Sequence, residues 1–348
     1  MVDSSPWLYD TADADFNIEY SVGIFGDNTD GEITQTGGDR KTHTISCWHK
    51  RAPEGYIMGD GEGEADYSSN DLWGTPSEGD TLRFNAQDLA FFHEGGSGSS
   101  LVTDRKFRDL SAWYHFVVAI DTTQSTAANR IKIYVNGIQE TSFSTETYPD
   151  QNDEFKLMQS GQTFYIGAGH IGNTSINGLG YYADFIIVDG AALAPTEFGE
   201  FDADSGIWKP KKFTGDLNVG SGTNGAHYKF EGTAEGTGSG STGLDSGGES
   251  NNMNFENQKG GLPDTPSNNF TTWQGGVLMN STGASGDNIR LYDGNTRIAR
   301  GGGTGWTTVY NTMSPSGGKW YMEFLVPETD ITSAVGVVPR SKVNSADR

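Results

Sequence analysis

The alternation of apolar and polar residues in the middle of the chain is the strongest constraint on its fold. Residues 131–135 (IKIYV) place an apolar side chain at every second position, which is typical of a strand with one buried face. Asn136-Gly137 follows at once, and this dipeptide favours a type I′ turn. We therefore expect a β-hairpin, with residues 138–143 as its returning strand.

Similar short stretches recur along the sequence, separated by Gly, Asp and Asn residues. Residues 113–120 (WYHFVVAI) are almost continuously apolar, which predicts a strand covered on both faces. Helix signals are few, and Pro195 marks one short helical turn at 193–198. This pattern predicts an all-β chain built as an antiparallel sandwich. The other predicted strands of the sandwich are 43–50, 81–85, 164–168, 182–188 and 227–231.

Composition and charge exclude several classes of protein. Of the 348 residues 49 are Gly, which disfavours a helical bundle. The net charge of −23 would repel a polyanion, so we exclude nucleic acid as a partner. The first residues do not resemble a signal peptide, and no apolar run approaches the ~20 residues of a membrane helix. We therefore expect neither membrane insertion nor secretion through a signal peptide. The single cysteine, Cys47, allows no intrachain disulfide and is expected in the core.

Changes in composition divide the chain into four segments. Gly, Ser and Asn dominate from residue 232 onward, as in a flexible connector. Alternation then returns, and residues 319–326 (KWYMEFLV) predict a strand, but few residues follow it. We predict, in chain order, an N-terminal arm at 1–14, a β-sandwich at 15–231, a linker at 232–264 and a partial second β unit at 265–348.

The strands of the first β unit resemble a known module. Residues 113–119 (WYHFVVA), followed by 130–137 (RIKIYVNG), resemble the concanavalin A-like, laminin-G-like (pentraxin-like) domain, and residues 44–51 and 181–185 extend the match. The resemblance covers roughly residues 15 to 230 and implies an antiparallel jelly-roll β-sandwich. Residues 316–324 resemble the opening of a SPRY domain, which implies a second, incomplete β-sandwich unit.

The order of these parts resembles large proteins of environmental bacteriophages. The segments 200–210 and 264–270, which follow the laminin-G-like strands and precede the SPRY-like opening, belong to the same resemblance. It implies a structural protein of the virion surface, either a tail fibre or appendage or a head fibre or decoration. The implied partners are other virion proteins, further copies of the chain (a trimer if it is a fibre) and a glycan of the host surface. Such a protein is made in the host cytoplasm and resides on the virion surface.

Two sets of residues are candidates for ligand binding. Trp73, Trp208, Trp273 and Trp306 lie outside the clearest strands and could stack on sugar rings, although core packing is the commoner role of Trp. Asp60, Glu62, Glu64 and Asp66 alternate with small residues, and calcium prefers such oxygen ligands on a flexible loop. Laminin-G-like domains can hold calcium at one rim, but an acidic chain also carries many carboxylates for solubility alone.

A third acidic set raises the alternative of an enzyme. Glu200, Asp202 and Asp204 have the i, i+2, i+4 spacing by which glycanases of this fold direct three carboxylates into one cleft. They follow a helical turn and precede a Ser-Gly turn, outside any apolar strand, so we read them as a solvated loop. We expect no catalytic activity and keep a polysaccharide hydrolase as the alternative.

Overall fold

The structure of the chain is a computed structural model. It describes residues 16–24, 30–51, 69–76, 79–93, 98–168, 180–255, 260–269, 271, 273–280, 288–292, 297–301, 307–311 and 323.

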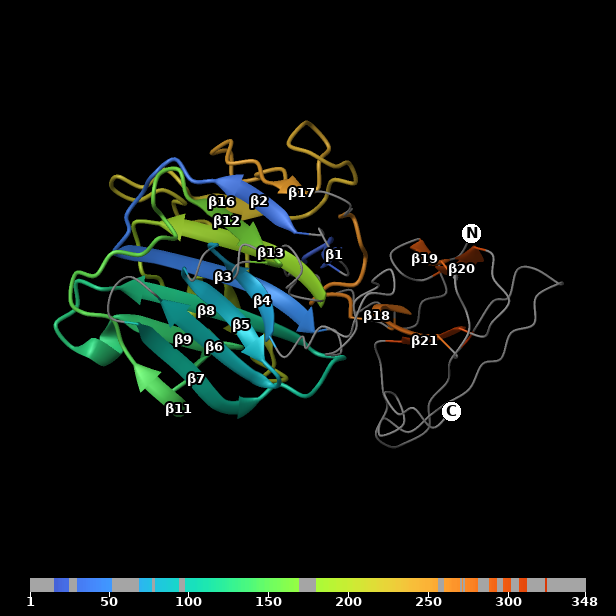
Figure 1. Cartoon of the computed structure of the whole chain (residues 1–348), viewed down its shortest axis with the longest axis horizontal. Coiled ribbons are helices and arrows are strands. Elements are labelled where there is room, and N and C mark those ends of the chain that lie inside the picture. The colour runs from blue at the N-terminus through green and yellow to red at the C-terminus, as the bar shows by residue number, and fades with distance from the viewer. Residues whose placement is uncertain are drawn as a thin grey trace.

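Two antiparallel sheets lie face to face in the described part of the chain (Figure 1). The smaller sheet has seven strands, in the spatial order β1 (Val22–Ile24), β13 (Gly180–Asp189), β3 (Thr42–Arg51), β8 (Trp113–Asp121), β9 (Ile131–Val135) and β10 (Ile138–Gln139), with β16 (Ala226–Tyr228) also paired to β13. The larger sheet has eight, in the order β11 (Phe143–Thr147), β7 (Ser99–Lys106), β6 (Asp88–His93), β5 (Thr81–Asn85), β4 (Ser69–Gly74), β12 (Thr163–Ile166), β2 (Gly31–Thr34) and β17 (Asn254–Phe255). The expected antiparallel β-sandwich is therefore confirmed.

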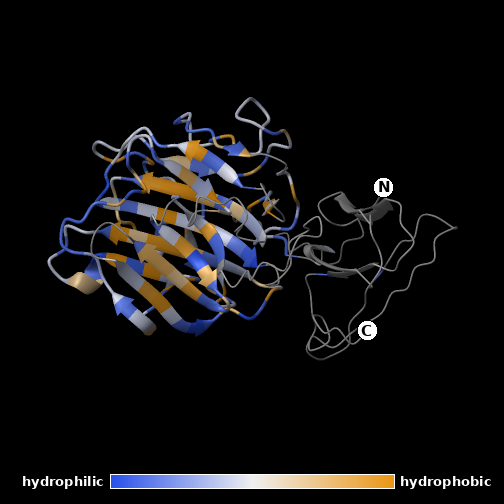
Figure 2. Ribbon diagram, in the orientation of Figure 1, coloured by the Kyte–Doolittle hydropathy of each residue, from blue (hydrophilic) through white to orange (hydrophobic). Residues whose placement is uncertain are grey.

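The main core lies between the two sheets. Because successive side chains of a strand point to opposite faces, Ile45 and Cys47 of β3 enter this core together with Phe116 of β8. They meet apolar side chains of the larger sheet, such as Phe84 and Phe91. In Figure 2 apolar residues run along the strands of both sheets. Cys47 is fully buried, as expected.

The smaller sheet is also covered on its outer face. Segments from 190 to 217 cross this face, where Phe198, Phe213 and Leu217 pack on Ile186 and Val117. A separate outer cluster combines Trp48, Trp113, Tyr181, Ala183, Ile18 and Trp208. The prediction that residues 113–120 form a strand covered on both faces is thus confirmed.

The predicted hairpin is shorter than expected. Asn136 and Gly137 both have positive φ, as a type I′ turn requires. The returning strand β10 pairs with β9 at only two residues. The chain then leaves this sheet and pairs with β7 of the larger sheet from Phe143 onward. Our expectation of a returning strand through residue 143 was therefore wrong, because the chain crosses here from one sheet to the other.

The segment 232–264, expected to be a linker, packs on the sandwich. Its strand β17 pairs with β2 and extends the larger sheet. Met253 and Phe255 are fully buried in the main core. Gly31 of β2 makes room for them, because a Cβ there would lie 2.4 Å from the Phe255 ring. Sparse apolar residues at the right positions thus anchor a sequence whose composition is typical of a linker.

The remaining elements are short. A hairpin of β14 (Gly199–Phe201) and β15 (Trp208–Pro210) follows the 3-10 helix Pro195–Glu197, and another 3-10 turn spans Ala127–Asn129. Further along, β18 (Trp273–Asn280) pairs with β21 (Thr307–Asn311), and β19 (Asn288–Tyr292) with β20 (Arg297–Gly301). No helix in the described residues is long and apolar enough to cross a membrane.

Candidate functional site

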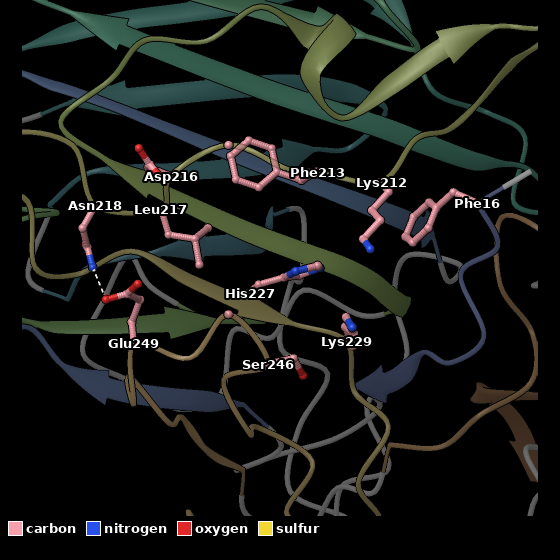
Figure 3. Close-up of a pocket in the computed structure, with 12 residues that line it drawn as sticks. Phe16, Lys212, Phe213, Asp216, Leu217, Asn218, His227, Lys229, Ser246 and Glu249 are labelled. Carbon is pink, nitrogen blue, oxygen red and sulfur yellow. Dashed lines mark hydrogen bonds between the residues drawn. The ribbon is translucent and has the colours of Figure 1, made fainter.

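A pocket of about 410 Å³ opens on the outer face of β13 and β16 (Figure 3). Four stretches of the chain build it: the segment before β1, the segment after β15, strand β16 with the residue that follows it, and the loop at 246–249. The side chains and glycines that line it are Phe16, Lys212, Phe213, Gly215, Asp216, Leu217, Asn218, His227, Lys229, Ser246, Gly247 and Glu249.

A bulge in β13 places a carboxylate next to His227, which lines this pocket. The pairing of β13 with β3 shifts register between Ala183 and Ile186, and Asp184 adopts a φ of 47°. Asp tolerates this left-handed conformation better than most residues, and a bulge re-aims a side chain out of the regular alternation. Asp184 thereby reaches His227 of the neighbouring strand β16, with 2.6 Å between its Oδ1 and the imidazole Nε2.

His227 faces the pocket because its neighbours in β16 face the core. Ala226 and Tyr228 enter the main core, so alternation directs the residue between them outward. The backbone N–H of His227 donates to Asp245 Oδ1 at 2.9 Å. The same carboxylate accepts from the N–H of Gly247 at 2.9 Å and, through Oδ2, from that of Asn251 at 3.2 Å. Asp245 is buried, and these bonds fix the loop that forms one wall of the pocket.

Opposite charges line opposite ends of the pocket. Figure 3 shows Lys212 and Lys229 at the end nearest the Phe16 ring, and Asp216 and Glu249 at the other end. Neither ammonium group forms an ion pair or hydrogen bond with any residue that the structure describes. These groups can therefore bind the hydroxyls or acidic groups of a small polar ligand, while the aromatic rings contact its apolar faces.

The four tryptophans proposed for sugar stacking have different surroundings. Trp73 is fully buried between Phe91 and Phe164, and its ring is inaccessible to a ligand. Trp208 is only 8% exposed, and its indole N–H donates to His115 Nδ1 at 3.0 Å, so it packs on the sheet. Trp273, at the start of β18, is partly buried. Trp306 lies outside the described residues, and so do the calcium candidates Asp60, Glu62, Glu64 and Asp66.

An exposed aromatic residue that we did not predict lies beside Trp208. Phe201 is 51% exposed and packs edge-on against the Trp208 ring, with 4.9 Å between the ring centroids. No clear signal for it was present in the sequence, because β14 has only three residues and both Glu200 and Phe201 are exposed. The signal for the pocket in the sequence was a single acidic residue, Asp184, within the apolar stretch 182–188.

The acidic set at 200–204 forms a tight turn. Asp202 Oδ1 accepts hydrogen bonds from the N–H groups of Asp204 and Ser205 and from the Ser205 hydroxyl. These bonds, led by the Ser205 N–H, lower the pKa of Asp202 to about 2. Lys209 Nζ lies 3.6 Å from Glu200 and 3.4 Å from Asp202. The carboxylates thus stabilise a hairpin at the surface. In the part of the chain that is described, no three His, Cys, Asp or Glu side chains are grouped to hold a metal ion.

One family model matches the part of the chain that contains most of the sandwich strands. Residues 25–195 match the concanavalin A-like lectin/glucanases superfamily. This match confirms the resemblance drawn from the strands of the first β unit. No curated protein matches the sequence.

Several solved structures match part of the chain at low sequence identity. The LG4-5 domains of the mouse laminin alpha1 chain are 13% identical, with a TM-score of 0.35, and cover 59% of this chain and 47% of theirs. A botulinum neurotoxin type C structure, described as dependent on two ganglioside molecules for cell entry, is 14% identical, with a TM-score of 0.34 and coverages of 51% and 40%. Domain 4 of the Geobacillus stearothermophilus arabinanase AbnA, in complex with arabinotriose, is 17% identical, with a TM-score of 0.30 and coverages of 50% and 66%. The chain spans less than half the length of the laminin and neurotoxin chains.

Proposed function

We propose that this chain is a non-catalytic glycan-binding protein and that the pocket over β13 and β16 holds the sugar. The observation that carries the proposal is the combination of two unpaired lysines, a His–Asp pair and aromatic rings around one cavity of about 410 Å³. A sugar ring offers apolar faces to aromatic side chains and hydroxyls to charged and amide groups. The family matched by residues 25–195 includes lectins by its own description, which supports this choice.

We further propose that the protein resides on the surface of a bacteriophage particle, as a fibre or a decoration, and binds a glycan of the host envelope. This proposal rests on the sequence resemblance, in which a laminin-G-like module is followed by the start of a SPRY-like domain. Its partners would be other virion proteins and further copies of the chain. Labelling of purified particles with an antibody against the sandwich tests it, since an unlabelled particle surface would contradict the assignment.

Glycan binding is tested on an array with purified full-length protein and the double variant Lys212→Ala/Lys229→Ala. A hydrogen bond to a charged group contributes about 1.5–3 kcal/mol, so we expect the double variant to bind at least about tenfold more weakly. The matched control is Lys132→Ala, because Lys132 lies on β9, three strands away from β13 in the same sheet. Equal binding by the double variant would exclude this pocket, and absence of any glycan signal would exclude the function.

The alternative function is a polysaccharide hydrolase on the same fold. The superfamily description includes glucanases, which keeps this alternative open. Release of reducing sugar from a polysaccharide, abolished by Glu200→Gln, would establish it and overturn the non-catalytic proposal.

A further inference from the structure

Three side chains from distant parts of the sequence meet on the outer face of the smaller sheet, beside Trp113 and Tyr181. Lys50 of β3 is fully buried, and its Nζ donates to Asp264 Oδ2 and to Asn269 Oδ1, both at 2.8 Å. The Asp264 side chain is also fully buried. Asn269 lies 219 residues after Lys50. An ion pair would need only Lys50 and Asp264. Asn269 is a third group, and its carboxamide oxygen accepts a hydrogen bond from the same amine.

Aromatic side chains flank Lys50 and Asp264, and a backbone carbonyl holds Asn269. The Trp113 indole N–H donates to Asp264 Oδ1 at 3.2 Å, and the Tyr181 ring centroid lies 6.0 Å from Lys50 Nζ. The carboxamide of Asn269 is oriented by a hydrogen bond from its Nδ2 to the carbonyl of Ser111 at 2.9 Å.

The backbone around Asp264 is held as well. The Ser21 hydroxyl donates to the Asp264 carbonyl at 2.6 Å, and the Ile18 N–H donates to Ser267 Oγ at 2.9 Å. These contacts hold the segment 264–269 on the sandwich and so keep the backbone of Asp264 and Asn269 close to Lys50.

We propose that Lys50 and Asn269 join in an intramolecular amide bond, with Asp264 as the group that transfers the protons. The Nζ–Cγ bond forms, the Cγ–Nδ2 bond breaks, and ammonia leaves. Asp264 first accepts a proton from the ammonium group, which frees the lone pair of Nζ for attack on Cγ. The Asp264 carboxyl then returns this proton to the departing Nδ2, which leaves as ammonia. The regenerated Asp264 carboxylate takes the second proton from Nζ, which an amide nitrogen does not keep, and passes it to the ammonia, which reaches solvent as ammonium. No oxidant, reductant or cofactor is required.

The geometry and the environment both suit this reaction. Nζ lies 2.8 Å from Oδ1 of Asn269, and the C=O bond is about 1.23 Å long, so Nζ is at most about 4 Å from Cγ. This is close to the separation of about 3–3.5 Å from which bonds form. Rotation about the terminal torsion of Asn269, which is a soft one, turns the face of the carboxamide toward Nζ. Burial disfavours the ammonium ion, and this desolvation lowers the pKa of Lys50 although the Asp264 charge opposes it. Asn269 is exposed at its outer side, which gives ammonia a path to solvent.

The bond would fasten the end of the sandwich. It would join β3, in the middle of the smaller sheet, to the segment that leads into β18, and so close a covalent loop over more than half of the chain. Such a cross-link restricts the unfolded chain in the way that a disulfide does. It would supply this restraint in a protein whose single cysteine cannot.

Mass spectrometry of the denatured full-length protein tests the proposal directly. We expect the intact mass to be lower than that of the linear sequence by one ammonia, and a tryptic digest to contain a branched peptide joining Lys50 to Asn269. The Lys50→Arg, Asn269→Ala and Asp264→Asn variants should each have the linear mass, whereas Asn268→Ala, a neighbouring control, should retain the loss. A linear mass for the unaltered protein without the branched peptide would overturn the proposal. A loss of ammonia that persists in Lys50→Arg would also overturn it, because cyclisation of an Asn residue elsewhere gives the same mass.

Discussion

Three histidines lie inside the sandwich where a positive charge is unfavourable. Burial lowers the pKa of His43 to about 4 and that of His115 to about 3, and burial together with the Arg51 charge lowers the pKa of His49 to about 3. In the unfolded chain each would titrate near 6.5. Between pH 6.5 and about 4 the unfolded state therefore binds more protons than the folded state, so acid favours unfolding.

We expect the free energy of unfolding to fall as the pH decreases from 7 to 4.5. Each histidine contributes a slope of up to about 1.4 kcal/mol per pH unit. His43→Leu should reduce this slope, and the loss of the ring is tolerable because neither ring nitrogen of His43 has a hydrogen-bond partner in the described structure. Urea titrations at several pH values measure both quantities. A slope equal in the variant and the unaltered protein would contradict the assignment to His43.

At the scale of the element, the Gly-rich segment before residue 264 acts as part of the sandwich. Its strand β17 has only two residues, so its pairing with β2 contributes little by itself, and the buried Met253 and Phe255 side chains attach it to the core.

Replacement of this side chain distinguishes a packed segment from a linker. We expect Phe255→Ala to lower the free energy of unfolding by about 3–5 kcal/mol, the usual cost of a Phe cavity in a core. The matched control is Phe201→Ala, since Phe201 is 51% exposed and its loss should cost less than about 1 kcal/mol. Denaturant unfolding of the two variants gives the comparison, and equal costs would indicate that 232–264 does not stabilise the sandwich.

The strands were predictable because their signal is local. The pattern at 81–85 gave the bounds of β5 directly, and the dense run at 113–120 fell within β8. The attachment of β17 was not predictable from its own residues. It depends on the absence of a side chain at Gly31, which lies more than 220 residues earlier in the sequence. The candidate site depended likewise on the bulge at Asp184, whose effect appears only when β13 pairs with β3 and β16.

At the scale of the whole molecule, the segment from 265 onward depends on the sandwich for its anchorage. Asp264 and Asn269 are bound to Lys50, and the Tyr181 hydroxyl donates to the Trp273 carbonyl at 3.5 Å. Beyond these contacts, the described strands form two separate pairs, β18 with β21 and β19 with β20. A two-stranded unit is marginally stable alone in water, and its unpaired edges can pair with another chain.

We therefore predict that residues 265–348, expressed alone, do not form a stable monomer, because excision removes the contacts to Lys50 and Tyr181 and leaves open strand edges. Hydrogen exchange should show little protection of its amides. In the full chain a neighbouring copy would cover the same edges, so light scattering should give an oligomer, and a trimer if the protein is a fibre. The excised sandwich, residues 16–269, is the control and should remain monomeric, since it retains the Lys50 cluster. A well-protected monomer of 265–348 would show that this unit needs neither the sandwich nor a second copy, and the argument for assembly through its edges would fail.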